Sequence, residues 1–153
     1  MSEERTFVMA KPDAVQRGLI GEIVSRLEQR GFKLVAGKFM QIDESLAHEH
    51  YAEHTDKPFF DELVEFITSG PVFAMVWAGE DVTRQVRHMI GATDPAEADP
   101  GTVRGDYALD LTQNIVHASD HEDPGANERE IALFFDEDEL IDYSRVDEKW
   151  VKS

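Results

Sequence analysis

His117 is the strongest candidate for chemistry in this sequence. It lies in the run Asn-Ile-Val-His-Ala-Ser-Asp at residues 114–120. An imidazole is nucleophilic and largely uncharged near neutral pH, so it can accept a transferred group covalently. Such a nucleophile needs a partner that selects its tautomer, and by composition Asp120 and Glu130 are candidates. Taken alone, a histidine in such a loop is far more often an ordinary polar residue than a nucleophile.

Four cations add a second kind of chemistry. Arg84 and Arg87 are three residues apart on a predicted helix face, and Arg104 lies in the run Thr-Val-Arg-Gly-Asp. Lys11 ends the first predicted strand. Guanidinium groups match the geometry of phosphate oxygens, although each could instead pair with one of the 32 acidic residues. A nucleotide site in so acidic a chain must concentrate its few cations, and this grouping favours phosphate handling.

Aromatic and histidine side chains offer weaker signals. Phe59 and Phe60 are adjacent, so one can enter the core while the other stacks on a ligand, or both can be core residues. His48, His50 and His54 share one helical stretch. His50 and His54 have the spacing of half a metal site, but no further ligand cluster has the right spacing. These histidines are therefore predicted to be mainly exposed helix residues.

The elements that must position these residues follow from apolar periodicity. Helices are predicted at residues 19–30, 43–54, 59–68 and 81–90, and strands at residues 6–10, 32–42, 72–77 and 130–135. This order gives two split βαβ units, which predict an α+β ferredoxin-like sandwich with a four-stranded antiparallel sheet flanked by helices. Between residues 90 and 130 there is little patterning, and long irregular stretches in compact domains are often functional.

Composition limits the class of protein. The 153 residues fit one domain spanning 1–153, and the absence of cysteine excludes disulfides and thiolate chemistry. The N-terminus lacks the pattern of a signal peptide, and the longest apolar stretch, residues 71–78, is too short to cross a bilayer, so a cytoplasmic protein is expected. A net charge of −17 disfavours nucleic acid and anionic membrane as partners.

The acidic residues allow two interpretations. They could serve an acidic partner-binding protein, or they could adapt the surface to concentrated salt, where charge repulsion is screened. The acids are scattered along the chain instead of gathering in one tail, which favours the salt-adapted interpretation.

Several motifs together carry a family resemblance. The chain resembles the nucleoside diphosphate kinase family over essentially its whole length. The matched segments, in order, are KPD at 11–13, VQRGL at 15–19, HY at 50–51, PFF at 58–60, SGPV at 69–72, GATDP at 91–95, PGTVRGD at 100–106 and NIVHASD at 114–120.

The resemblance implies a role for each matched position. His117 would be the nucleophile that takes the γ-phosphate, with Tyr51 beside it. Ser119 and Glu130 would support His117. The nucleotide would meet Phe59 and Leu111 at the base, Lys11 and Asn114 at the ribose hydroxyls and phosphates, and Arg87, Thr93, Arg104 and His54 at the phosphates.

The resemblance also implies a reaction, a cofactor and an assembly. The γ-phosphate would pass from a nucleoside triphosphate to a nucleoside diphosphate in a ping-pong cycle through phospho-His117. Mg²⁺ would be held mainly by the nucleotide's phosphates, with Asp120 reaching it through water, so no dedicated protein metal site is expected. Stacking on Phe59 reads the face of a base, which predicts broad base tolerance. The expected assembly is a homohexamer.

The chain departs from the family pattern at three places. Ala118 and Ala14 stand where the family usually has glycine, and a β-carbon directly after the nucleophile requires a negative φ. The stretch 121–127 is longer than in many relatives, which makes Glu128 a rival of Glu130 as the supporting carboxylate.

Two other function classes fit the sequence less well than an enzyme. An RRM-type nucleic-acid module would need a basic surface and an aromatic RNP pattern, and both are absent from the sequence. An inactive scaffold with the same fold would have no need to retain Lys11, Arg87, Arg104, Asn114 and His117 together.

Overall fold

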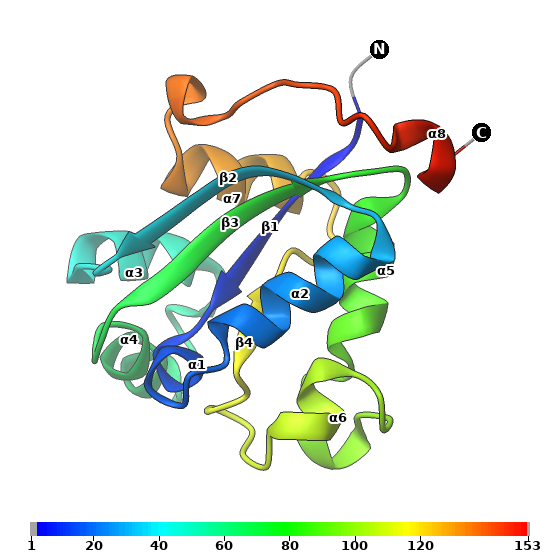
Figure 1. Ribbon diagram of the computed structural model, residues 1–153. Coiled ribbons are helices and arrows are strands. Elements are labelled where there is room, and N and C mark those ends of the chain that lie inside the picture. Colours follow the sequence, from blue (N-terminus) through cyan, green and yellow to red (C-terminus); the bar gives the residue numbers. More distant parts are fainter. Residues whose placement is uncertain (1–2, 153) are drawn as a thin grey trace.

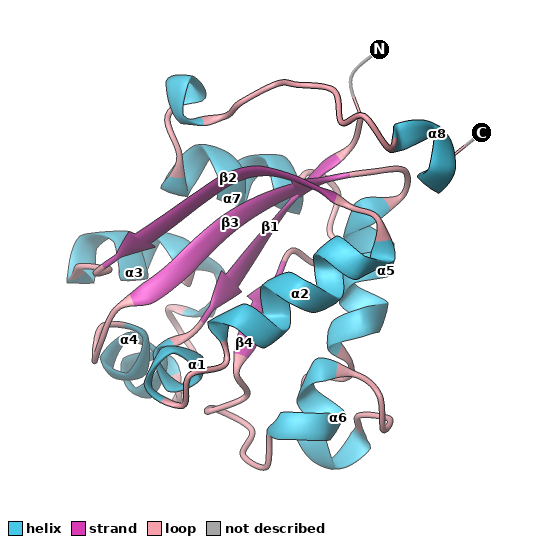
Figure 2. Ribbon diagram, viewed as in Figure 1, coloured by secondary structure: helices cyan, strands magenta, loops and turns pink. Residues whose placement is uncertain are grey.

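A single four-stranded antiparallel sheet forms the centre of the protein. The structure is a computed structural model that describes residues 3–152. The sheet order is β2-β3-β1-β4 (Figures 1 and 2), with every neighbouring pair antiparallel. The strands are β1 (Arg5–Ala10), β2 (Lys33–Met40), β3 (Val72–Ala78) and β4 (Val116–Ala118).

The central strands β1 and β3 are buried on both faces. Phe7 and Met9 point to one side of β1, and Val8 and Ala10 to the other, because successive side chains alternate across a strand. The first side packs under α3 (Glu44–His50), α4 (Phe60–Ile67) and α7 (Ala126–Phe134). The second packs under α2 (Ile20–Arg30) and α5 (Val82–Ile90), which cover the near face in Figure 1. The result is the predicted ferredoxin-like α+β sandwich.

Shorter elements complete the chain. They are the helices α1 (Pro12–Gln16), α6 (Val103–Tyr107) and α8 (Glu148–Val151), and the 3₁₀ turns at Ala52–His54, Pro95–Glu97 and Glu137–Glu139. Local sequence explains several boundaries. Asp43 accepts the backbone N–H of Leu46 at the start of α3, and Gly31 ends α2 with φ of 107°, a value that favours glycine.

The last predicted strand is wrong. Residues 130–135 fall largely within helix α7, and the fourth strand is β4, in the stretch predicted to be irregular. Ile131, Leu133, Phe134 and Phe135 suggest a strand by composition. However, Ile131 and Phe134 of α7 pack in one core cluster with Phe7 and Met9 of β1, and this tertiary packing decides the conformation.

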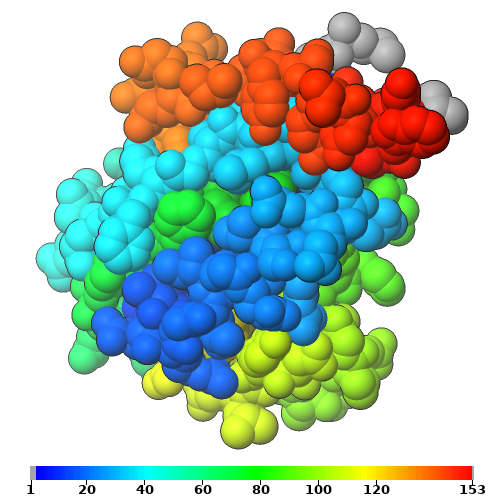
Figure 3. Space-filling model, in the orientation of Figure 1, coloured from blue at the N-terminus to red at the C-terminus, as the bar shows by residue number. Residues whose placement is uncertain are grey.

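The C-terminal segment returns along the outer strand of the sheet. Ile141 donates its backbone N–H to Val35 O at 3.1 Å, and Arg145 donates to the carbonyls of Phe32 and Gly31 at 2.9 and 2.8 Å. Figure 3 shows this segment, coloured orange to red, along the upper side of the molecule. Within residues 3–152 there is no helix long and apolar enough to span a membrane.

We predict that Gly105→Ala destabilises the protein by about 1–3 kcal/mol, because its added methyl group must displace backbone. A β-carbon at Gly105 would lie 2.0 Å from the carbonyl oxygen of Asp99. Gly21→Ala is the matched control: a β-carbon there meets nothing within 4 Å, and alanine favours a helix by up to about 1 kcal/mol. Urea unfolding in concentrated KCl measures both. Equal stabilities of the two variants would show that the α6 segment yields easily.

Candidate active site

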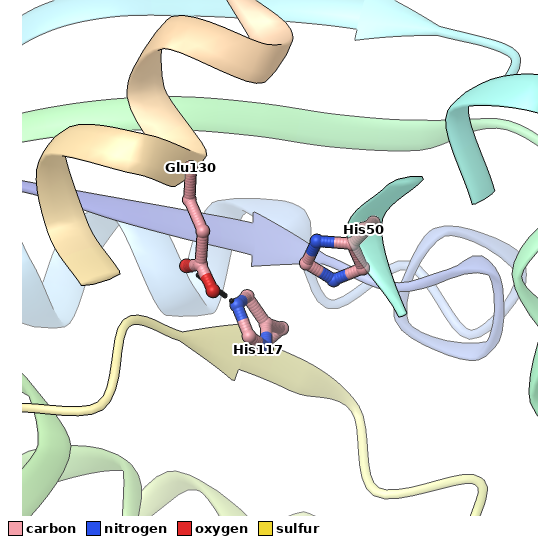
Figure 4. Close-up of side chains that lie close together, drawn as sticks. All are labelled: His50, His117 and Glu130. Carbon is pink, nitrogen blue, oxygen red and sulfur yellow. Dashed lines mark hydrogen bonds and ion pairs between the residues drawn. The ribbon is translucent and has the colours of Figure 1, made fainter. Parts of the chain in front are cut away.

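His117 lies in the middle of β4, opposite Met9 of β1. Its Nε2 is 2.9 Å from Oε1 of Glu130, a residue of α7, and Figure 4 shows these two side chains pointing toward one another. Ser119 donates its hydroxyl to the same carboxylate oxygen at 2.7 Å. Strand and helix both pack on β1, and this shared support holds the imidazole and the carboxylate together.

The carboxylate of Glu130 is ionised across the neutral range. Burial opposes its ionisation, but hydrogen bonds from His117 and Ser119 and the positive charge that the nearby imidazoles carry when protonated outweigh burial and lower the pKa of Glu130 to about 2. An ionised carboxylate only accepts hydrogen bonds, so Nε2 of His117 carries the proton and donates it. The lone pair of the neutral ring therefore lies on Nδ1. The rival carboxylate, Glu128, is exposed.

The backbone before His117 is held in an unfavourable conformation. Ile115 has φ of 78°, and a β-branched residue rarely adopts a positive φ. Two hydrogen bonds hold it: its N–H donates to Asp13 Oδ2 at 2.9 Å, and its carbonyl accepts from Lys11 N at 2.9 Å. Ala118, by contrast, is a strand residue paired with Val8 and is not among the described residues with positive φ. The methyl group after the histidine therefore causes no backbone strain.

A buried lysine–asparagine pair flanks the histidine segment. Lys11 donates to Asn114 Oδ1 at 2.7 Å and to Thr112 O at 3.1 Å. Asn114 in turn donates to Thr93 O at 3.1 Å. Burial lowers the pKa of Lys11 to about 8; the Asp13 carboxylate opposes this, and Arg104 adds to it. Lys11 is thus a cation whose charge is costly to keep without an anion.

Two arginines hold the backbone around His117. Arg104 is only 4% exposed and donates to Gly91 O at 2.9 Å, Val116 O at 2.7 Å and Asn114 O at 3.3 Å. Burial, with the charge of Arg87, lowers the pKa of Arg104 to about 10.

Arg87 donates to Ala118 O at 2.9 Å, so carbonyls on both sides of His117 are bound by guanidinium groups. Arg84 is exposed and forms an ion pair with Asp81 at 2.6 Å. For Arg84 the structure therefore shows pairing with an acidic residue, which the sequence also allowed.

Aromatic rings form the outer part of the site. Phe59 is 43% exposed, whereas Phe60 is in the core. Of the two arrangements that the sequence allowed, the structure therefore has the one with a single phenylalanine in the core. The ring of His54 lies 5.8 Å from Phe59 and 6.3 Å from Tyr51. Burial and the Glu130 charge raise the pKa of Tyr51 to about 12. Leu111 is exposed, as is Thr93.

His50 is not the exposed residue that the sequence predicted. Its ring lies 4.8 Å from the ring of His117, nearly perpendicular to it, and both of its ring nitrogens are buried without a hydrogen-bond partner. Burial, with the nearby His117, lowers the pKa of His50 to about 3. Helical spacing could have found it: Leu46 and Ala47 pack inward, and His50 follows them by four and three residues.

Comparisons with known proteins agree in one assignment. Residues 4–140 match the family model described as nucleoside diphosphate kinase. A nucleoside diphosphate kinase from Haloarcula marismortui is 72% identical over 99% of each chain, and one from Halorubrum lacusprofundi is 74% identical over 97% of this chain and 94% of that protein. The chain belongs to the nucleoside diphosphate kinase family. The solved structure of a halophilic nucleoside diphosphate kinase from Halobacterium salinarum in complex with CDP has a TM-score of 0.98 and 71% identity, and 99% of both chains is covered.

Membership of the nucleoside diphosphate kinase family makes the chain a phosphotransferase that acts on nucleotides. Several close relatives come from salt-loving archaea, which supports the salt-adapted interpretation of its acidic surface. The family resemblance found in the sequence is therefore confirmed.

We predict that nucleoside diphosphate affinity falls as the pH rises through about 8. Lys11 is charged below its pKa and neutral above it, so raising the pH removes a cation that phosphate would meet. Loss of one charge-assisted hydrogen bond should weaken binding roughly tenfold. Calorimetric titration of ADP from about pH 7 to about pH 10 measures the effect. Lys11→Arg keeps its charge and should flatten the profile; an equally flat profile for the native chain would contradict this role of Lys11.

Proposed function

We propose that the chain transfers the γ-phosphate of a nucleoside triphosphate to a nucleoside diphosphate in two half-reactions through phosphorylated His117. The observation that carries this proposal is the 2.9 Å contact between His117 Nε2 and Glu130 Oε1. It leaves the lone pair on Nδ1, and it provides a fixed negative charge next to the ring at the moment the ring becomes cationic.

Bond changes in the first half-reaction are simple. Nδ1 of His117 forms a bond to the γ-phosphorus as the bond from that phosphorus to the bridging oxygen breaks, and the nucleoside diphosphate leaves with the electron pair. The proton on Nε2 stays there, held by Glu130, while Ser119 donates to the same carboxylate oxygen. In the second half-reaction an oxygen of the acceptor diphosphate attacks the phosphohistidine, and the steps run in reverse.

Lys11, Arg87 and Arg104 would neutralise the phosphates. A guanidinium group has five N–H donors. Arg104 donates through three of its nitrogens to backbone carbonyls, and the remaining N–H groups are available to an anion. In-line transfer depends mainly on positioning and charge, so buried and tethered cations suit it better than mobile surface ones. Asn114 and Thr93 would add polar contacts near the ribose and phosphates.

Base recognition would rest on stacking. Phe59 is half-exposed next to the site, and Leu111 is exposed. Stacking has no requirement for particular hydrogen-bonding edges, so this arrangement supports tolerance of different bases.

Mg²⁺ would arrive on the nucleotide. The ion prefers oxygen ligands, whereas the side chains around His117 are mainly nitrogen donors and cations, and the Glu130 oxygen nearest the ring is already hydrogen-bonded. These residues fit an ion that is held by phosphate oxygens, with exposed Asp120 reaching it through water. When bound, Mg²⁺ would supply charge neutralisation at the phosphates.

Assembly as a cytoplasmic homohexamer is part of the proposal. Large apolar side chains are exposed on the single chain, among them Leu109 and Val146 at 99% and Trp150 at 81%, and such exposure supports contacts with further copies. Sedimentation in concentrated KCl is expected to give six chains per particle; a monomer would contradict it.

A phosphoenzyme trap tests the proposed reaction. The native chain, mixed with γ-labelled ATP and Mg²⁺ in concentrated salt and then denatured, should hold an acid-labile, alkali-stable label that unlabelled GDP removes. His117→Gln should take no label. A native chain that binds ATP without taking label would identify a nucleotide-binding scaffold instead.

Glu130→Gln and Glu128→Gln form a matched pair in the same experiment. Removing the charge beside His117 should slow labelling by about 10²-fold or more, since one fixed electrostatic partner commonly contributes that much. Glu128→Gln should take the label at the native rate, because Glu128 is exposed. Equal rates for the two variants would rule out Glu130 as the supporting carboxylate.

A further inference from the structure

We propose that His50, His117 and Glu130 form a binding site for a transition-metal ion of the Zn²⁺ type, and that the ion and the phosphoryl group exclude one another at His117. The metal-binding half of this inference is independent of the reaction proposed above, whereas the exclusion rests on it.

The three side chains converge from three separate elements. His50 ends α3, His117 lies in β4 and Glu130 in α7 (Figure 4), and one potential ligand atom from each lies within 4.8 Å of the other two. Among residues 3–152 this is the one group of three histidine or acidic side chains so arranged. Two imidazoles and a carboxylate are the protein ligands of a common class of zinc site with an open fourth position.

His50 provides the strongest sign of an absent ligand. Both of its ring nitrogens are buried, and neither has a hydrogen-bond partner. Phe7, Tyr51 and Phe134 surround the ring and offer it no such partner. A buried polar group without a partner costs free energy, and native structures contain few of them. A metal ion would satisfy the nitrogen to which it binds.

The geometry requires only local adjustment. Zn²⁺ binds imidazole nitrogen at about 2.0–2.1 Å, so the ligand atoms of a tetrahedral site lie roughly 3.4 Å apart. His117 Nε2 and Glu130 Oε1, at 2.9 Å, are already closer than that. The ring of His50 has no hydrogen bond to restrain its rotation toward them. Ser119 donates to Glu130 and would keep the carboxylate oriented.

Donor chemistry separates this ion from the Mg²⁺ of the reaction. Imidazole nitrogens favour Zn²⁺, Cu²⁺ and Ni²⁺, whereas Mg²⁺ requires oxygen ligands. The positive charge of Lys11 nearby opposes any cation, and the carboxylate of Glu130 attracts one. An ion that forms strong bonds to nitrogen overcomes this repulsion, and a hard ion does not.

Occupation of the site would block phosphoryl transfer. If the metal binds Nε2 of His117, the proton of Nε2 moves to Nδ1, which then lacks the lone pair needed to attack phosphorus. If the metal binds Nδ1, it uses that lone pair directly. Conversely, in the phosphorylated ring Nδ1 is bonded to phosphorus and Nε2 keeps the proton held by Glu130, so the ring offers the metal no lone pair.

Calorimetry with ZnCl₂ and visible absorption with Co²⁺, on untagged full-length protein in KCl, test the site. The native chain should bind one Zn²⁺ per chain, with Mg²⁺ in excess failing to displace it, and Co²⁺ should give the intense bands of a four- or five-coordinate ion. His50→Gln and His50→Phe should weaken binding more than about tenfold, because even residues that only orient a metal ligand contribute that much. His48→Gln, an exposed histidine on the same helix, should bind as the native chain does.

Two results would overturn the metal site: no Zn²⁺ binding by the native chain, or equal affinity in the native chain and in both folded His50 variants. Exclusion is tested separately, by titrating Zn²⁺ into protein pre-labelled with phosphate. Phosphorylated chains should bind no Zn²⁺ at this site, and undiminished binding would contradict exclusion. Failure to label at all would count against the proposed reaction and leave the metal result standing.

Discussion

The hydrogen bond between His117 and Glu130 joins an edge strand to a helix, and the proposed chemistry depends on it. Each residue is held by a different element, yet β4 and α7 share β1 as their support. Ser119 connects β1 and α7: its backbone N–H donates to Phe7 O of β1, and its hydroxyl donates to Glu130 of α7. A small movement of either element would separate the imidazole from the charge that selects its tautomer. The tight packing of β1 is therefore a requirement of the site as well as of stability.

Three cationic side chains lie close to His117 and bind the backbone around it. Lys11, Arg87 and Arg104 all donate to backbone carbonyl groups near His117, so each helps to hold the backbone around this residue. This arrangement fixes the three cations in place, and in the proposed reaction such pre-organised donors would lose little entropy on binding phosphate. The same backbone segment includes the strained Ile115, which is held by hydrogen bonds to the Asp13 carboxylate and the Lys11 backbone.

The rest of the surface has the opposite charge. With 32 acidic and 15 basic residues, the chain repels itself at low ionic strength, and salt screens that repulsion within a few ångströms. A relative from Halobacterium salinarum is itself described as halophilic. The acidic surface and the cations near His117 are compatible because Lys11 and Arg104 are buried, and buried charges are screened much less than those of the surface.

The sequence by itself determined the fold class, the extents of most helices and strands, and the family, because these depend on local periodicity, capping residues and ordered motifs. It identified His117 and the cations near it. It did not determine that residues 130–135 are mainly helical, that Glu130 and not Glu128 contacts His117, or that His50 lies against the same ring. These depend on which elements share β1 as a support, and residues 50, 117 and 130 are too far apart in the chain for any local pattern to bring them together. Only the packing of α3 and α7 on the face of the sheet from which His117 of β4 projects does so.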